Sequence, residues 1–262
     1  MGILGGLLGR TILNAVAPPQ RRIVGSRDPH KESKTKSNLK THFGDDFIEK
    51  ISGKTVLDFG CGFGVQSVEV AKLGAGKVIG IDILENRLNG AIELAEAQGV
   101  GSICQFTKHT DQKADIILSK DSFEHFDDPS KILMLMDELL KPEGRVLASF
   151  GPTWYHPYGG HSFSVFPWAH LIFTEKSLIE WRSQFKNDGA TRFREIDGGL
   201  NQLTIYGFES IVERSPFRIL KYSAIPISGI SVLASKPLRE FGASIVRYEL
   251  VKKKVSAVNL IP

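Results

Sequence analysis

Apolar runs alternate with amphipathic stretches between residues 53 and 150 of this 262-residue chain. Short runs rich in β-branched residues predict strands, and apolar residues that recur every three to four positions predict helices. The expected strands are 54–60, 77–82, 102–106, 114–119 and 145–150, and the expected helices are 65–73, 84–98 and 127–140. Strands that alternate with helices are typical of a parallel sheet with crossover helices. The pattern therefore predicts an α/β fold.

Capping and turn residues define the ends of these elements. Asp128 is expected to cap the helix that follows it, with Pro129 in the first turn. The stretch "KPEG" is expected to turn the chain into the strand at 145–150. A helix over 38–51 is expected to cover the sheet edge. A helix over 201–214 and strands at 217–227 and 242–253 complete the expected order of elements.

The regular alternation stops at Gly151, and the next fifty residues are rich in aromatic side chains, histidine and glycine. The aromatic and histidine residues are Trp154, Tyr155, His156, Tyr158, His161, Phe163, Phe166, Trp168, His170 and Phe173. Such a cluster either packs an insertion onto the sheet or lines a pocket, and both alternatives stay open. We expect four segments: a leader (1–37), a core (38–150), a cap insertion (151–200) and a C-terminal part of the fold (201–262).

The leader combines apolar and basic residues. Residues 1–43 hold eight Lys and Arg against two acidic residues, in a chain whose net charge is only +4. We expect a solvated basic segment rather than a nucleic-acid-binding arm. The apolar residues of the leader are Ile3, Leu4, Leu7, Leu8, Ile12 and Leu13. They form a stripe that either contacts a membrane surface or docks on the protein's own body, and the sequence does not decide between these alternatives.

Cys61 and Cys104 lack the spacing of a disulfide framework or a zinc site, so we expect no metal. Charged residues make up 24% of the chain, and no run is long and apolar enough to cross a bilayer. A cytoplasmic protein is the simplest expectation, and the sequence does not indicate its oligomeric state.

The segment "VLDFGCGFGV" (56–65) holds the chemistry of the predicted core. Gly60, Gly62 and Gly64 follow the first strand and open the next helix, so the backbone N–H groups point to a ligand above the sheet. Asp58 lies two residues before the first glycine. A carboxylate here repels a pyrophosphate but attracts a sulfonium cation. The segment therefore disfavours a nicotinamide-dependent oxidoreductase.

Three segments together resemble class I S-adenosylmethionine-dependent methyltransferases. They are "VLDFGCGFG", "VIGIDI" and the stretch from "ADIILS" through "FEH" to "LKPEGRVLAS". The resemblance implies a Rossmann-like doubly wound sheet of seven strands, mostly parallel with an antiparallel last strand. It implies S-adenosyl-L-methionine as cofactor and an acid, Asp82, that binds the ribose hydroxyls. The implied cofactor-binding residues are Asp58, Gly60, Cys61, Gly62, Gly64, Asp82, Ile83 and Ser119. The adenine contact stays open between Thr110 and Asp111.

Methyl transfer depends mainly on the alignment of donor and acceptor, but an oxygen or nitrogen acceptor can also need a base. His125 follows the fourth strand, and His156 and His161 flank "PYGG" in the cap, so these three are the candidate catalytic residues. Each has a plain structural alternative, a histidine held by loop hydrogen bonds. A metal site with His170 lacks a recognised spacing.

The sequence thus favours a methyltransferase that acts on a small molecule, which an aromatic cap would make apolar or aromatic. Two other functions stay open: a nicotinamide-dependent oxidoreductase and a methyltransferase-like binding protein without catalysis. A nucleic-acid methyltransferase is disfavoured because "SKDSFEH" follows the fourth strand, where a target-base motif with two prolines and an aromatic residue would stand.

Overall fold

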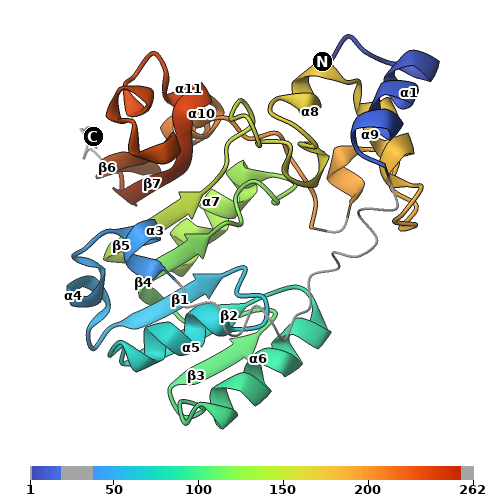
Figure 1. Cartoon of the computed structure of the whole chain (residues 1–262). Coiled ribbons are helices and arrows are strands. Elements are labelled where there is room, and N and C mark those ends of the chain that lie inside the picture. Colours follow the sequence, from blue (N-terminus) through green and yellow to red (C-terminus); the bar gives the residue numbers. More distant parts are fainter. Residues whose placement is uncertain (1, 19–37, 197, 255–262) are drawn as a thin grey trace, which may run out of the picture.

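A seven-stranded sheet forms the centre of the computed structural model, which describes residues 2–18, 38–196 and 198–254 (Figure 1). The strands are β1 (Thr55–Phe59), β2 (Lys77–Ile81), β3 (Cys104–Thr107), β4 (Ala114–Lys120), β5 (Leu140–Phe150), β6 (Phe217–Pro226) and β7 (Ala243–Lys252), in the spatial order β3-β2-β1-β4-β5-β7-β6. The pairs among β1 to β5 are parallel, and β7 runs antiparallel to both of its neighbours. The predicted fold class is confirmed, including the antiparallel last strand.

Helices cover both faces of the sheet (Figure 1). One face carries α3 (Leu39–Phe43), α4 (Phe47–Ile51), α5 (Val65–Lys72) and α6 (Glu85–Ala97), and the other carries α7 (Pro129–Leu139) and α10 (Ile205–Arg214). Successive residues of a strand point to opposite faces, so Leu57 belongs to the core beneath α7 and α10, and Val56 to the core beneath α3, α4 and α5. Asp58 points to the same face as Val56, toward α5.

Most predicted elements are confirmed, but the helix expected over 201–214 begins only at Ile205, and two further expectations are wrong. Asp128 caps α7 as expected, because its Oδ1 accepts hydrogen bonds from the N–H groups of Ser130 and Lys131. The expected helix over 38–51 is two short helices, since Gly44 between them has a φ of 98°. The expected turn "KPEG" lies inside β5, where the β4–β5 register shifts and the extra residues bulge from the ladder.

The segment after β5 builds a separate lobe beyond the carboxyl ends of the strands (Figure 1). Its elements are α8 (Ala169–Ile172), α9 (Glu175–Arg182) and the 3₁₀ turns η3 (His161–Phe163) and η4 (Phe193–Glu195). The largest side chains of this cap lobe form a third core that includes Trp154, Phe163, Phe173 and Trp181. Packing is therefore the main role of the aromatic residues that the sequence concentrates here.

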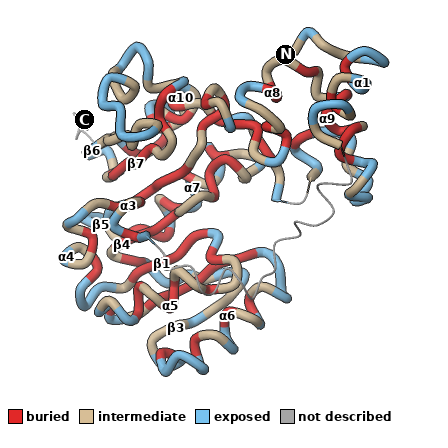
Figure 2. Tube along the Cα trace, viewed as in Figure 1, coloured by how far each residue is buried: buried red, intermediate tan, exposed pale blue. Residues whose placement is uncertain are grey.

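The N-terminal helix α1 (Gly6–Val16) is part of this lobe. Leu13 is fully buried in the third core, and Arg10 forms an ion pair with Glu180 of α9 at 2.9 Å. Trp181 Nε1 donates to the carbonyl of Ala17 at 2.9 Å. The structure thus places the leader helix against the protein's own body. Its other face, with Leu7 79% exposed, is turned outward (Figure 2).

The basic residues at positions 21–36 lie outside the described residues. No helix in the described ranges is long and apolar enough to cross a membrane.

A second elaboration joins β6 to β7 and was not expected from the sequence. This β6–β7 excursion (residues 227–242) contains η5 (Ile227–Gly229), η6 (Ser231–Ala234) and α11 (Arg239–Gly242). Arg239 lies over the ring of Tyr222 at 4.8 Å and pairs with Glu209 at 2.5 Å. The ring of Phe241 packs against Tyr155 with 5.5 Å between centroids. The excursion therefore contacts the cap lobe as well as the sheet.

The docking of α1 can be measured through the cap lobe, which holds all three tryptophans (Trp154, Trp168 and Trp181). Leu13→Ala should destabilise the lobe by about 2–5 kcal/mol, because it leaves a cavity in a packed core. Leu7→Ala in the same helix should change stability by less than about 0.5 kcal/mol, since the side chain is exposed. Urea unfolding followed by tryptophan fluorescence compares the two variants. Equal midpoints would show that α1 is not docked as described.

Candidate active site

The glycine-rich loop (residues 60–64) connects β1 to α5 through three left-handed residues. The φ angles are 84° at Gly60, 54° at Gly62 and 74° at Gly64, a region in which a side chain costs about 1–2 kcal/mol. The N–H groups of Gly60 and Cys61 both donate to the carbonyl of Ile81 at 2.9 Å. These bonds hold the loop against the carboxyl end of β2.

The three glycines differ in what lies next to them. A Cβ atom added at Gly60 would come within 2.9 Å of Ser122 Oγ, and one at Gly64 within 2.6 Å of Ala91 Cβ. A Cβ atom at Gly62 would meet nothing within 4 Å. Protein atoms thus require glycine at the first and third positions, whereas Gly62 borders open space that a ligand can enter.

Asp82 lies beside that open side of the loop, directly after β2. Its carboxylate accepts from the N–H of Gly62 at 3.0 Å and from the N–H of Leu84 at 2.9 Å, and it is 7% exposed. The guanidinium of Arg87 lies 3.8 Å away. A carboxylate offers about four lone pairs, so hydroxyl donors of a ligand can still be bound. Ile83, the neighbour of Asp82, is 83% exposed.

Asp58 is enclosed on the α5 side of the loop. Its oxygens accept from Gln66 Nε2 at 2.8 Å and from Ser67 Oγ at 2.6 Å, and burial raises the pKa of the carboxyl to about 6. These bonds tie the end of β1 to the first turns of α5. The direct attraction between this acid and a bound cation, which the sequence suggested, stays a prediction.

Two further predicted residues lie in the loop or near it. Cys61 is buried, and burial raises the pKa of its thiol far above the usual value, so the thiol stays protonated. Ser119 near the end of β4 is fully buried, and its hydroxyl has no hydrogen-bond partner among the described residues.

The structure brings two of the three candidate catalytic histidines together. His125, in the loop after β4, has its Nδ1 2.9 Å from the carbonyl of Gly199, and its ring lies 5.4 Å from that of His161. His156 instead accepts from the N–H of Tyr158 at 3.0 Å. Burial lowers the pKa of His156 to about 4, so it is neutral at pH 7.

The sequence reasoning missed Glu124, the residue before His125. Its carboxyl is 3% exposed, and burial raises its pKa to about 8. The loop around it is held by Asn201, whose Nδ2 donates to the carbonyls of Phe123 at 2.6 Å and Phe126 at 2.8 Å. The motif "FEH" contains the residue, but nothing in the sequence indicates that its carboxyl is buried.

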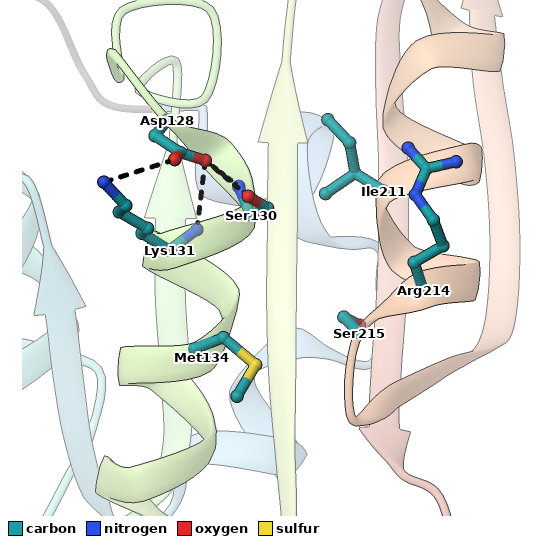
Figure 3. A pocket seen from close by; sticks show the side chains of 7 residues that line it. All are labelled: Asp128, Ser130, Lys131, Met134, Ile211, Arg214 and Ser215. Carbon is teal, nitrogen blue, oxygen red and sulfur yellow. Dashed lines mark hydrogen bonds and ion pairs between the residues drawn. The ribbon is translucent and has the colours of Figure 1, made fainter.

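A separate pocket of about 250 Å³ lies between α7 and α10, on the helical layer and not at the glycine-rich loop (Figure 3). Figure 3 shows Asp128 turned to the start of its own helix, where it binds Ser130 and Lys131, while Ile211 and Arg214 line the opposite wall. Asp128, Ser130 and Lys131 on one wall form the cap of α7, and the pocket lies apart from the site. Within the described ranges, no group of three His, Cys, Asp or Glu residues is arranged to hold a metal ion.

Comparison with known proteins agrees with this geometry. Residues 50–153 match the model of a family described as a methyltransferase domain. Ribosomal protein L11 methyltransferases from Escherichia coli and Citrobacter koseri are 40% identical over 73 residues, which cover 26% of this chain and 25% of theirs. The chain thus matches only about a quarter of the length of these curated relatives.

Solved structures share the fold across most of the chain. A magnesium protoporphyrin IX methyltransferase from Synechocystis PCC 6803 with bound SAH has a TM-score of 0.50 at 18% identity, covering 93% of this chain and 98% of that one. A SAM-dependent methyltransferase from Aquifex aeolicus has a TM-score of 0.50 at 16% identity, covering 86% and 98%. The mitomycin 7-O-methyltransferase has a TM-score of 0.52 at 15% identity, covering 93% and 60%. At this identity these likenesses concern the fold.

The chain therefore carries a methyltransferase domain, on the sheet and helix arrangement of class I S-adenosylmethionine-dependent methyltransferases. The family resemblance read from the sequence is confirmed. The match also supports S-adenosylmethionine as the cofactor.

The two kinds of glycine in the loop predict different stabilities. Gly64→Ala should cost about 2–5 kcal/mol, because its Cβ collides with α6 in addition to the backbone strain. Gly62→Ala should cost only about 1–2 kcal/mol, because the strain is its only cost. Urea unfolding measures both variants, and equal losses would contradict the open side of Gly62.

Burial of Glu124 predicts a pH dependence of stability. Its carboxyl is protonated in the folded protein up to about pH 8 but ionises near 4.5 when unfolded. Between these values the folded state binds the extra proton, so its contribution to stability falls as the pH rises, by up to about 1.4 kcal/mol per unit. Glu124→Gln should remove this part of the slope, measured by urea unfolding at several pH values. Parallel curves for variant and wild type would show that the carboxyl is ionised in the fold.

Proposed function

We propose that this protein transfers a methyl group from S-adenosylmethionine to a small apolar or aromatic molecule. The observation that carries the proposal is the open side of Gly62 next to the Asp82 carboxylate. This arrangement provides backbone, free space and hydrogen-bond acceptors at one edge of the sheet. The methyltransferase-domain match over residues 50–153 covers these residues.

The residues at this edge fit the chemistry of the cofactor. Asp82 would hold the ribose hydroxyls, and the exposed side chain of Ile83 would offer an apolar surface to the adenine. When bound, S-adenosylmethionine supplies an electrophilic methyl group on a positively charged sulfur. Asp58 and Asp82 make the surroundings of the loop favourable for a cation and unfavourable for a diphosphate, which argues against the nicotinamide alternative.

The acceptor would bind where the cap lobe meets the β6–β7 excursion. Trp154, Phe163 and Phe173 of the cap are buried in the third core. By contrast, Tyr206 of α10 is 74% exposed and Phe241 of the excursion is 50% exposed. Tyr206 and Phe241 lie near each other: the N–H of Tyr206 donates to the carboxylate of Glu240, which precedes Phe241 in the chain, at 2.7 Å. Phe241 in turn contacts Tyr155 of the cap. An exposed aromatic surface of this kind suits an apolar acceptor.

A small acceptor is proposed in preference to a ribosomal protein. The ribosomal-protein relatives match only 26% of this chain, so most of the chain has no counterpart in that match. The cap lobe and the excursion supply the side chains beyond the ends of β4 and β5. The rings of His125 and His161 contact each other where the loop after β4 meets the cap, and we propose that they also contact the acceptor.

Cofactor binding is tested most directly through Asp82. Wild type should bind S-adenosylhomocysteine with a Kd of about 1–10 μM in calorimetry, and Asp82→Ala should weaken binding by about 1–3 kcal/mol, because ribose hydroxyls lose their acceptor. Glu93→Ala, an exposed carboxylate on α6, is the matched control and should bind normally. Binding of NAD in place of S-adenosylhomocysteine would overturn the proposal.

Identification of the acceptor needs a labelled methyl group. Incubation of the protein with methyl-labelled S-adenosylmethionine and fractionated cell extract should place the label in a small-molecule fraction. Label in a protein or nucleic-acid fraction would contradict the substrate class. S-adenosylhomocysteine binding without transfer to any fraction would favour the non-catalytic alternative.

A further inference from the structure

Glu124 carries a buried polar atom that the fold does not use. One carboxyl oxygen accepts from the N–H of Gly151 at 3.4 Å, and the other, Oε2, is enclosed without a hydrogen-bond partner among the described residues. An enclosed carboxyl oxygen without a donor is unfavourable and rare in folded proteins. A donor brought by a ligand would satisfy it.

The position of Glu124 links the two halves of the site. Its neighbours in the loop after β4 border the glycine-rich loop, since a Cβ atom at Gly60 would lie 2.9 Å from Ser122 Oγ and 3.9 Å from the ring of Phe126. On its other side, Gly151 begins the cap. The carboxyl thus lies between the wall of the cofactor site and the entry to the cap lobe.

A second unpartnered group lies close along the chain. Thr153, two residues after Gly151, is 1% exposed, and its hydroxyl also lacks a partner within the described part of the chain. Its position is fixed on both sides: the carbonyl of Thr153 accepts from the N–H of His156 at 3.0 Å, and the N–H of Trp154 donates to Leu203 at 2.9 Å. Thr153 therefore lies in a loop held by backbone hydrogen bonds, two residues after the Gly151 N–H that Glu124 accepts from.

We propose that Glu124 binds a weakly acidic hydroxyl group of the acceptor, such as that of a phenol, and removes its proton during methyl transfer, with Thr153 as a second contact. This inference rests on the proposed methyltransferase function. The hydroxyl proton passes to the ionised carboxyl, and an oxygen electron pair forms the new bond to the methyl carbon. The carbon–sulfur bond breaks toward sulfur, which becomes a neutral thioether.

The surroundings of Glu124 suit such a base. Burial is the main cause that raises the pKa of the Glu124 carboxyl to about 8, and the negative charge of Asp121 adds to it. The positive charge of Lys120 lowers this pKa. A general base is most effective when its pKa is close to the working pH, and a phenol titrates only about two units higher. Because only the ionised form accepts a proton, the transfer rate should rise with pH and level off above about 8.

The experiment compares Glu124→Gln with wild type in two assays. The glutamine keeps an acceptor for the N–H of Gly151 but cannot take a proton. Calorimetry with S-adenosylhomocysteine should give the same Kd for both, whereas initial rates of label transfer into the acceptor fraction should fall about a hundredfold or more. The rising limb of the pH profile should disappear in Glu124→Gln. Asp127→Asn, an exposed carboxylate in the same loop, is the control and should behave as wild type.

Thr153→Val tests the second contact and should raise the KM for the acceptor more than it lowers kcat. A wild-type rate and pH profile in Glu124→Gln would overturn the proposal, and so would a labelled product that is a methyl ester, because a carboxylate acceptor needs no base. Failure of wild type to bind S-adenosylhomocysteine would instead refute the proposed function.

A measurement without any acceptor gives an independent test. In the S-adenosylhomocysteine complex at pH 7, isotope-edited infrared spectra should show a protonated carboxyl band that is missing from Glu124→Gln. A Glu124 carboxyl that is already ionised at pH 6 would contradict its role as a base matched to a phenol.

Discussion

The hydrogen bond from the Gly62 N–H to the Asp82 carboxylate joins the two loops on which the site depends. It connects the ends of β1 and β2, which the parallel register already places side by side, with Phe59 opposite Ile81. The same carboxylate accepts from Leu84 at the start of the α6 segment. One buried acid thus fixes the glycine-rich loop and faces the open side of Gly62. A change in its charge would disturb both the loop and any ligand beside it.

The two acids next to the glycine-rich loop, Asp58 and Asp82, have different structural roles. Asp58 is buried and accepts hydrogen bonds from Gln66 and Ser67, which connects it to the start of α5. Asp82 instead faces the open side of Gly62. The proposed acceptor contacts come from the neighbouring strands, where Glu124 and His125 lie in the loop after β4 and Thr153 follows the end of β5. In the proposed function, the donor would therefore bind at the glycine-rich loop and the acceptor further along the same sheet edge, at the loop after β4.

The sequence predicted the sheet well because its signals are local. Alternation, capping by Asp128 and the glycine spacing each act over a few residues, and the seven strands with an antiparallel last strand followed from the family resemblance. Contacts between segments far apart in the chain could not be predicted from these local signals. The burial of Glu124 depends on Asn201, 77 positions further along the chain, and the docking of α1 depends on a core built from residues of the cap. The break at Gly44 is local and was overlooked, whereas the bulge in β5 arises from its pairing with the distant strand β4.

The ring contact between Tyr155 and Phe241 has a mechanical consequence. It spans the cap lobe and the β6–β7 excursion, two segments that leave the sheet at different strands. Arg239, two residues before Phe241, joins the excursion to Tyr222 and Glu209. Any swing of the cap away from the strand ends must separate these rings. The pair therefore couples the position of the cap lobe to that of the excursion.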